Sequence, residues 1–153
     1  IKNMNNYSWN LDLIYDYALS SADDTNINDY YIGNVLRKTL EAYATFNYKK
    51  GISGLTQSEL ILSKIKDQEL KEHYKNRMLR LLLNSESHTE EAVKAIIDHV
   101  SFEQFSKEER IQVSKDVLSL LYLLDKEHIM SYLDDEEKIK NIQEWIKNSK
   151  YID

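Results

Sequence analysis

The sequence predicts an all-α fold, a single-domain helical bundle of about six to seven helices spanning residues 1–153. The first reason is composition: the 153 residues include no proline and only three glycines, which favours long helices joined by short polar loops. The second is that apolar residues recur at helical spacing along the chain. The third is that no strand alternation or hairpin dipeptide is present, and no repeat or low-complexity linker indicates a second domain.

Local signals place three helices in the first part of the chain. The second of them carries the broadest apolar set and is therefore expected to be the central helix. Lysines and glycines at 49–54 suit its C-terminal end, and the capping box Thr56-Gln-Ser-Glu59 opens the next, short helix. These helices are predicted over residues 10–20, 29–48 and 56–65.

Capping residues mark the remaining helices. Asp67 is expected to cap one helix, and the boxes Ser87-His-Thr-Glu90 and Ser106-Lys-Glu-Glu109 open two more. A turn is predicted around 127–132, before a last amphipathic helix that begins at about Asp134. The first three of these helices are predicted over residues 67–84, 88–99 and 106–124. Residues on the apolar helix faces should be buried, and these are Val35, Leu36, Leu40, Leu81, Leu82, Leu118 and Leu121.

Composition and missing motifs exclude several functional classes. Zero cysteines exclude disulfides, cysteine-based zinc sites and a thiol nucleophile. No apolar run approaches the ~20 residues of a membrane span and no signal peptide is visible, so we expect a cytoplasmic protein without a membrane partner. No His-Glu-x-x-His, P-loop or Gly-x-Ser-x-Gly motif is present, so we expect no metal site and no cofactor. Because the chain begins at Ile1, we expect it to be part of a longer polypeptide.

The charge is unevenly distributed. The whole chain carries a net charge of −6, but residues 37–80 hold ten basic and five acidic residues, a local net charge of +5. A local basic surface can attract a phosphate backbone even on an acidic protein. The alternative is an ordinary solvated charged face.

Arg37 and Glu41 lie one helical turn apart in the predicted helix 29–48, on a polar stripe that also includes Asn34. An arginine can hold a phosphate and a glutamate can transfer a proton, so the two are candidate catalytic residues. The alternative is an i,i+4 ion pair worth about 0.2–0.5 kcal/mol.

A second polar face leads towards a histidine. His73, Arg77, Arg80 and Asn84 share one face of the predicted helix 67–84, which points towards His88. At the first position of its helix, His88 would experience a dipole that favours a neutral, proton-accepting ring. The alternative is a solvent-exposed histidine beside a cap. His73 competes with His88 for the catalytic role, whereas His99 at a helix end and His128 in the predicted turn are weaker candidates.

At these residues the chain resembles a known family. The segments Ile32-Gly-Asn-Val-Leu-Arg-Lys-Thr-Leu-Glu-Ala-Tyr43 and Asn84-Ser-Glu-Ser-His88 are similar to the C-terminal HEPN-like helical domain of anticodon nucleases of the PrrC and RloC type, and of related coiled-coil, ABC-type defence ATPases. The resemblance covers about residues 29–125. It departs from the HEPN pattern before the histidine, where Asn84 takes the position expected for an arginine and Arg80 lies further away.

The resemblance implies a function and a set of site residues. It implies a metal-independent RNase, a toxin-like effector domain of an anti-phage defence ATPase that acts on tRNA and leaves a 2′,3′-cyclic phosphate. The catalytic residues would be Arg37, Glu41 and His88. Its partners would be RNA, its own or an associated ATPase domain, and a second copy of the chain in a homodimer. The substrate-binding residues would be Asn34, Lys38, Arg77, Arg80 and Asn84.

Two alternatives belong to other functional classes. The first is a non-catalytic helical module that docks on such an ATPase or senses a phage component. The second is an unrelated helical bundle that binds a protein partner. An open basic cleft shared by the candidate residues would favour the nuclease, and burial with mutual pairing would favour the module.

Overall fold

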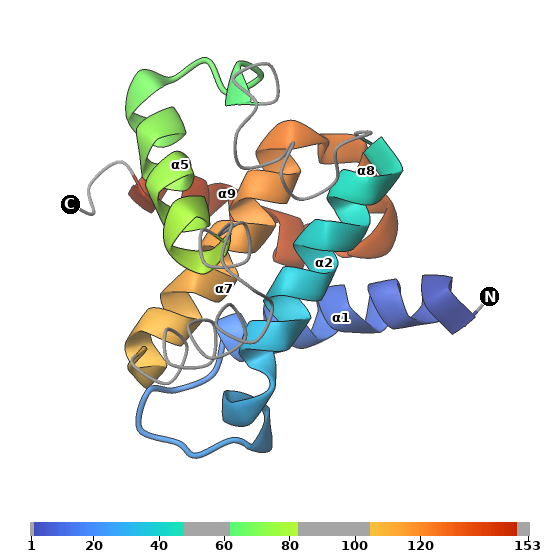
Figure 1. Ribbon diagram of the computed structural model, residues 1–153, viewed down its shortest axis with the longest axis vertical. Coiled ribbons are helices and arrows are strands. Elements are labelled where there is room, and N and C mark those ends of the chain that lie inside the picture. Colours follow the sequence, from blue (N-terminus) through green and yellow to red (C-terminus); the bar gives the residue numbers. More distant parts are fainter. Residues whose placement is uncertain (1, 48–61, 83–104, 150–153) are drawn as a thin grey trace, which may run out of the picture.

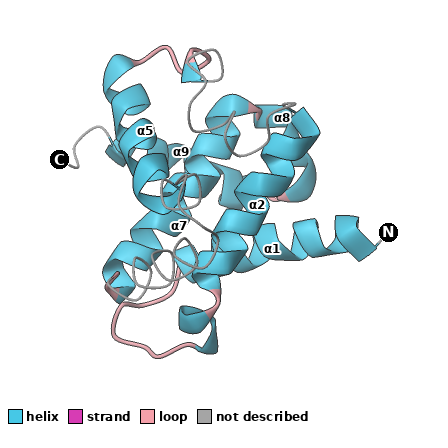
Figure 2. Ribbon diagram, in the orientation of Figure 1, coloured by secondary structure: helices cyan, strands magenta, loops and turns pink. Residues whose placement is uncertain are grey.

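The computed structural model describes residues 2–47, 62–82 and 105–149, and over these ranges the chain is all-α, with no strand (Figures 1 and 2). The predicted all-α class is confirmed. No helix within these ranges combines the length and the apolar character needed to cross a membrane. The helices are α1 (Lys2–Ala18), the short 3-10 helix η1 (Ile27–Tyr30), α2 (Ile32–Asn47), α5 (Gln68–Leu82), α7 (Lys107–Leu124), α8 (Lys126–Tyr132) and α9 (Glu136–Ser149).

The central helix is α7, so the prediction that helix 29–48 would be central is wrong. α7 packs against α1, α2, α5, α8 and α9, and Figure 1 shows α2 and α5 next to it. The physical reason is that α7 is buried on most of its sides, whereas one side of α2 is polar and faces solvent. α2 is therefore a peripheral helix with one buried face.

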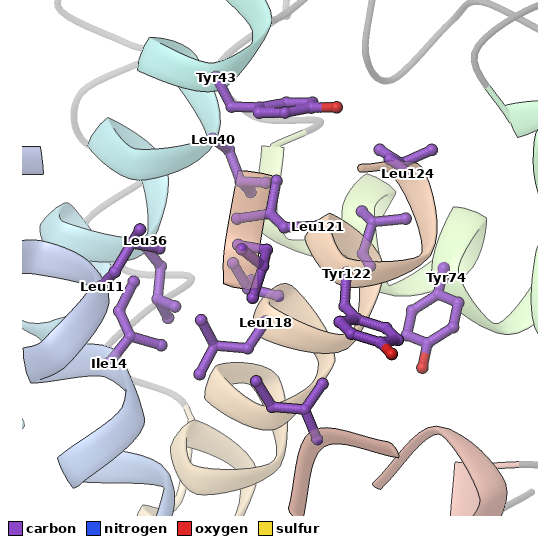
Figure 3. Packing of buried hydrophobic residues seen from close by; sticks show 14 of the residues in the cluster. Leu11, Ile14, Leu36, Leu40, Tyr43, Tyr74, Leu118, Leu121, Tyr122 and Leu124 are labelled. Atoms are coloured by element: carbon purple, nitrogen blue, oxygen red, sulfur yellow. The ribbon is translucent and has the colours of Figure 1, made fainter. Parts of the chain in front are cut away.

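The core confirms most of the predicted buried residues. Leu36, Leu40, Leu118 and Leu121 are fully buried where α2 meets α7 (Figure 3). Val35 is only half-buried and packs against the edge of this core. Leu81 and Leu82 belong to α5, but the surroundings of their side chains lie outside what the structure describes.

Predicted capping residues act as caps where the structure describes them. The Ser106 side chain accepts a hydrogen bond from the Glu109 backbone N–H (3.1 Å) and begins α7. The Asp67 carboxylate accepts a hydrogen bond from the Leu70 backbone N–H (3.1 Å) and caps the start of α5. Since a cap satisfies a backbone donor that has no partner within its helix, these starts are determined locally. The predicted helix 88–99 and most of 56–65 lie outside the described residues.

Three predicted boundaries are wrong. The predicted turn at 127–132 is the helix α8, because Asp125 ends α7 and its side chain also caps the next helix. α1 begins at Lys2 rather than near residue 10, and the half-buried Tyr7 packs this polar extension against the core. The predicted helix 29–48 is divided at Tyr31 into η1 and α2 because Asn26 and Asp29 form a capping box that fixes a separate turn.

Candidate active site

The predicted site residues on α2 differ in their exposure to solvent. Asn34, Lys38 and Glu41 are exposed. Arg37 is half-buried at the edge of the buried face of α2. The small residues Gly33 and Ala44, one and two turns away on the same edge, are buried. The helix thus presents Glu41 and Lys38 to solvent while the stem of Arg37 lies against the protein.

The second half of the predicted site is only partly described. Arg77 and Arg80 lie on α5, but nothing is described of their side chains. Asn84 and His88 lie outside the described residues. The convergence of Arg37, Glu41 and His88 therefore stays a prediction.

Lys38 and Glu41 line an open cavity of about 740 Å³, which we call the α1–α2–α8 groove. Its volume lies within the roughly 300–1,000 Å³ that is typical of small-molecule sites. α8 adjoins the C-terminal end of α2 in Figure 1. The groove is lined by Asn6, Tyr7 and Asn10 of α1, by Lys38, Glu41, Ala42, Tyr43, Thr45, Phe46 and Asn47 of α2, and by His128 and Tyr132 of α8.

The walls of the groove combine aromatic rings with amide groups. Phe46 stands at its edge with 88 % of its surface exposed, which is unusual for so large an apolar side chain. Asn6 and Asn10 add amide donors and acceptors from α1. A ring that can stack, amides that can bind polar edges and a lysine are the groups that bind single-stranded nucleic acids.

His128 is the histidine of this groove, and it lies among tyrosines. Its Nε2 is 2.8 Å from the hydroxyl oxygen of Tyr7. Its ring centroid is 5.5 Å from that of Tyr7, 5.4 Å from that of Tyr43 and 5.0 Å from that of Tyr132. Burial lowers the pKa of His128 from 6.5, although nearby Asp125 acts in the opposite direction. The imidazole is therefore neutral near pH 7.

His128 lies on the helix α8 rather than in the predicted turn, and it was therefore a weaker candidate from the sequence. A local signal was available, since Asp125 precedes His128 by three residues, the spacing of a helix cap, and Tyr132 follows it by one helical turn. The contact with Tyr7 joins residues 121 positions apart, so local spacing contained no signal for it.

His73, the competing candidate, does not line the groove and has a different partner. Its Nε2 is 3.2 Å from Oδ1 of Asp116 on α7, whose side chain is almost fully buried. Gln112 Nε2 donates to the same oxygen (3.1 Å). The His73 ring also contacts Tyr74 edge-on, at 4.9 Å between centroids. This network joins α5 to α7 in the interior. Local spacing contained no signal for Asp116, because its partner lies 43 positions away.

Among the residues that the structure describes, no group of three or more histidine or carboxylate side chains is placed to hold a metal ion. The groove itself offers proton-transfer groups and a cation, Glu41, His128 and Lys38. Such groups can move protons and bind a phosphate. No family model, curated protein or solved structure matches the chain.

Proposed function

We propose that this domain is a metal-independent endoribonuclease whose active site is the α1–α2–α8 groove. One observation carries the proposal: a carboxylate, an ammonium group and a neutral imidazole, from Glu41, Lys38 and His128, line one open cavity. General acid–base groups beside a cation are what phosphodiester cleavage by an internal hydroxyl requires.

In the proposed reaction the 2′-hydroxyl of RNA attacks its own 3′-phosphate. The O2′–P bond forms as the P–O5′ bond breaks, which leaves a 2′,3′-cyclic phosphate and a 5′-hydroxyl. Glu41 or a histidine accepts the 2′-hydroxyl proton, and O5′ takes up a proton from Lys38 or water. The Lys38 ammonium group, with Arg37 on the same helix, balances the charge of the phosphorane.

The motif resemblance supports the same reaction class. It assigns Arg37, Glu41 and His88 to catalysis, names tRNA as the substrate, and implies a HEPN-like domain that works with an ATPase and as a homodimer. The groove supports the Glu41 part of this assignment, because Glu41 is exposed and lines the cavity. For Arg37 the support is weaker, since the residue does not line the groove.

A second function, docking on an ATPase domain without catalysis, is favoured by a different surface. Ile27, Tyr30 and Tyr31 are 73 %, 86 % and 56 % exposed and stand together on and beside η1. Adjacent exposed apolar side chains are typical of protein-binding surfaces. The Lys107 ammonium group fixes η1 to α7 through Asp29 (2.6 Å), so this surface is held in place.

The nuclease is tested by incubating the protein with tRNA in the presence of EDTA. We expect cleavage with 2′,3′-cyclic phosphate ends, and a loss of about 100-fold or more in Glu41→Gln, which keeps the side chain's shape. Glu144→Gln is the matched control because Glu144 is an exposed glutamate on α9, outside the groove. Absence of cleavage by the wild type, or equal cleavage by both variants, would remove the nuclease and leave the docking module.

A further inference from the structure

We infer that His128, rather than the sequence-predicted His88, is the general base of the groove, and that Tyr7 is the residue that positions it. The inference deepens the proposed nuclease function and rests on it. Its starting observation is that His128 is a histidine among the residues lining the same cavity as Glu41 and Lys38.

The two ring nitrogens of His128 have different surroundings. Nε2 is hydrogen-bonded to the Tyr7 hydroxyl at 2.8 Å. Nδ1 makes no hydrogen bond within the described part of the chain. With the hydrogen on Nε2, the ring donates to the Tyr7 oxygen and Nδ1 keeps its lone pair. A base held by an orienting partner on its far nitrogen is the arrangement that proton abstraction needs.

The ring of His128 is also fixed in space. In addition to the contact with Tyr7, the rings of Tyr43 and Tyr132 pack against the His128 ring, at 5.4 Å and 5.0 Å between centroids. The His128 backbone N–H donates to Oδ1 of Asp125 at 3.2 Å, which fixes the residue at the start of α8. A base held in this way loses little freedom when substrate binds.

Burial favours the neutral ring of His128 and outweighs the opposing charge of Asp125. Lys38 and Glu41 line the groove from α2, Asp125 lies on the α7–α8 junction, and Tyr7 faces the ring from α1. Burial lowers the pKa of His128 and raises the pKa of Tyr7, so both side chains are uncharged near pH 7. The Nδ1 lone pair is then available at physiological pH.

The step balances with groups of the groove. Nδ1 takes the 2′-hydroxyl proton as O2′ bonds to phosphorus, the P–O5′ bond breaks, and the Lys38 ammonium group gives a proton to O5′. The role of Glu41 in this step is to keep Lys38 charged, since it lies three residues further along α2 in the same groove. After product release, the His128 imidazolium returns its proton to water and Lys38 regains one. No metal ion and no redox partner takes part.

The test compares four variants in the EDTA-resistant tRNA cleavage assay. We expect His128→Asn to lower kcat about 100-fold or more, and Tyr7→Phe to lower it about tenfold with an unchanged KM. Tyr122→Phe is the matched control, since it removes a tyrosine hydroxyl that accepts a hydrogen bond from Gln143 (2.9 Å) and does not line the groove. Glu144→Gln, which lies outside the groove, should cleave at the wild-type rate. The acidic limb of the wild-type pH profile should lie below pH 6.5.

Each outcome decides the inference. If His128→Asn cleaves like the wild type while Glu41→Gln is inactive, His128 is not the base and the nuclease proposal stands. If His128→Asn does not fold, the two tyrosine variants decide: equal rates for Tyr7→Phe and Tyr122→Phe overturn the inference. A wild-type protein that cleaves no tRNA overturns the inference and the proposed function together.

Discussion

The two histidines described on this chain are held in opposite ways. His73 pairs with Asp116, a carboxylate in the interior between α5 and α7, and lies away from the α1–α2–α8 groove. His128 pairs with an uncharged tyrosine hydroxyl and lies in the wall of that groove. A buried charge needs its partner for the fold to tolerate it, whereas a neutral ring beside an open cavity retains its proton-accepting capacity. We therefore expect His73 to contribute to stability and His128 to the proposed proton transfer.

The largest expected effect is on stability at the first histidine. His73→Ala removes a partner of the buried Asp116 and should lower the free energy of unfolding by about 3 kcal/mol. Its cleavage rate should stay near that of the wild type, since His73 does not line the groove. Urea denaturation followed by circular dichroism measures the first quantity, and the tRNA assay measures the second.

His128→Asn is the control for this comparison, because it should show the reverse: a small change in stability and a large loss of rate. A His73→Ala protein that is as stable as the wild type but inactive would exchange the two roles. His73 would then be the catalytic histidine, the alternative that the sequence left open.

The second prediction concerns RNA binding in the groove. Phe46→Ala should weaken binding of a short, non-cleavable 2′-O-methyl RNA by about 1–3 kcal/mol, because stacking on an exposed ring would be lost. Trp9→Ala is the matched control, since Trp9 is 72 % exposed on α1 but does not line the groove. Fluorescence anisotropy of labelled RNA measures both affinities. Equal losses in the two variants would mean that the RNA does not use the groove.

Local signals predicted the fold better than they predicted the site. Ser106 and Asp67 begin helices where expected, since a cap acts within one turn and can be recognised from a few residues. The centrality of α7 was missed, because burial on all sides depends on which helices pack around it. The site depends even more on distant pairing: Glu41 was identified from spacing and Lys38 from the resemblance, but His128 needs Tyr7, 121 positions away.

The smallest predicted effect concerns the pair of Asp29 and Lys107 near the surface. It tests whether this pair stabilises the fold as the buried pair of His73 and Asp116 is expected to do. Asp29 accepts hydrogen bonds from Lys107 Nζ (2.6 Å) and from the Tyr17 hydroxyl (2.7 Å). Burial raises the pKa of this carboxyl, but the hydrogen bonds from Lys107 and Tyr17 outweigh burial and lower it from 3.8 to about 2. Asp29 thus contributes stability that is present above pH 3.8 and lost as the pH falls towards about 2.

Lys107→Met should therefore lower the free energy of unfolding by about 1 kcal/mol at pH 7. The difference from the wild type should narrow as the pH falls through about 2, because Asp29 becomes protonated in both proteins below that pH. Lys138→Met is the matched control, because Lys138 approaches the half-exposed Asp12 only to 3.8 Å and should contribute little. Urea denaturation of the three proteins at several pH values measures these differences. If the difference in unfolding free energy between Lys107→Met and the wild type stays constant with pH, the charge of Asp29 does not stabilise the fold. Charge pairing alone would then not distinguish His73, whose partner is a carboxylate, from His128, whose partner is a tyrosine hydroxyl.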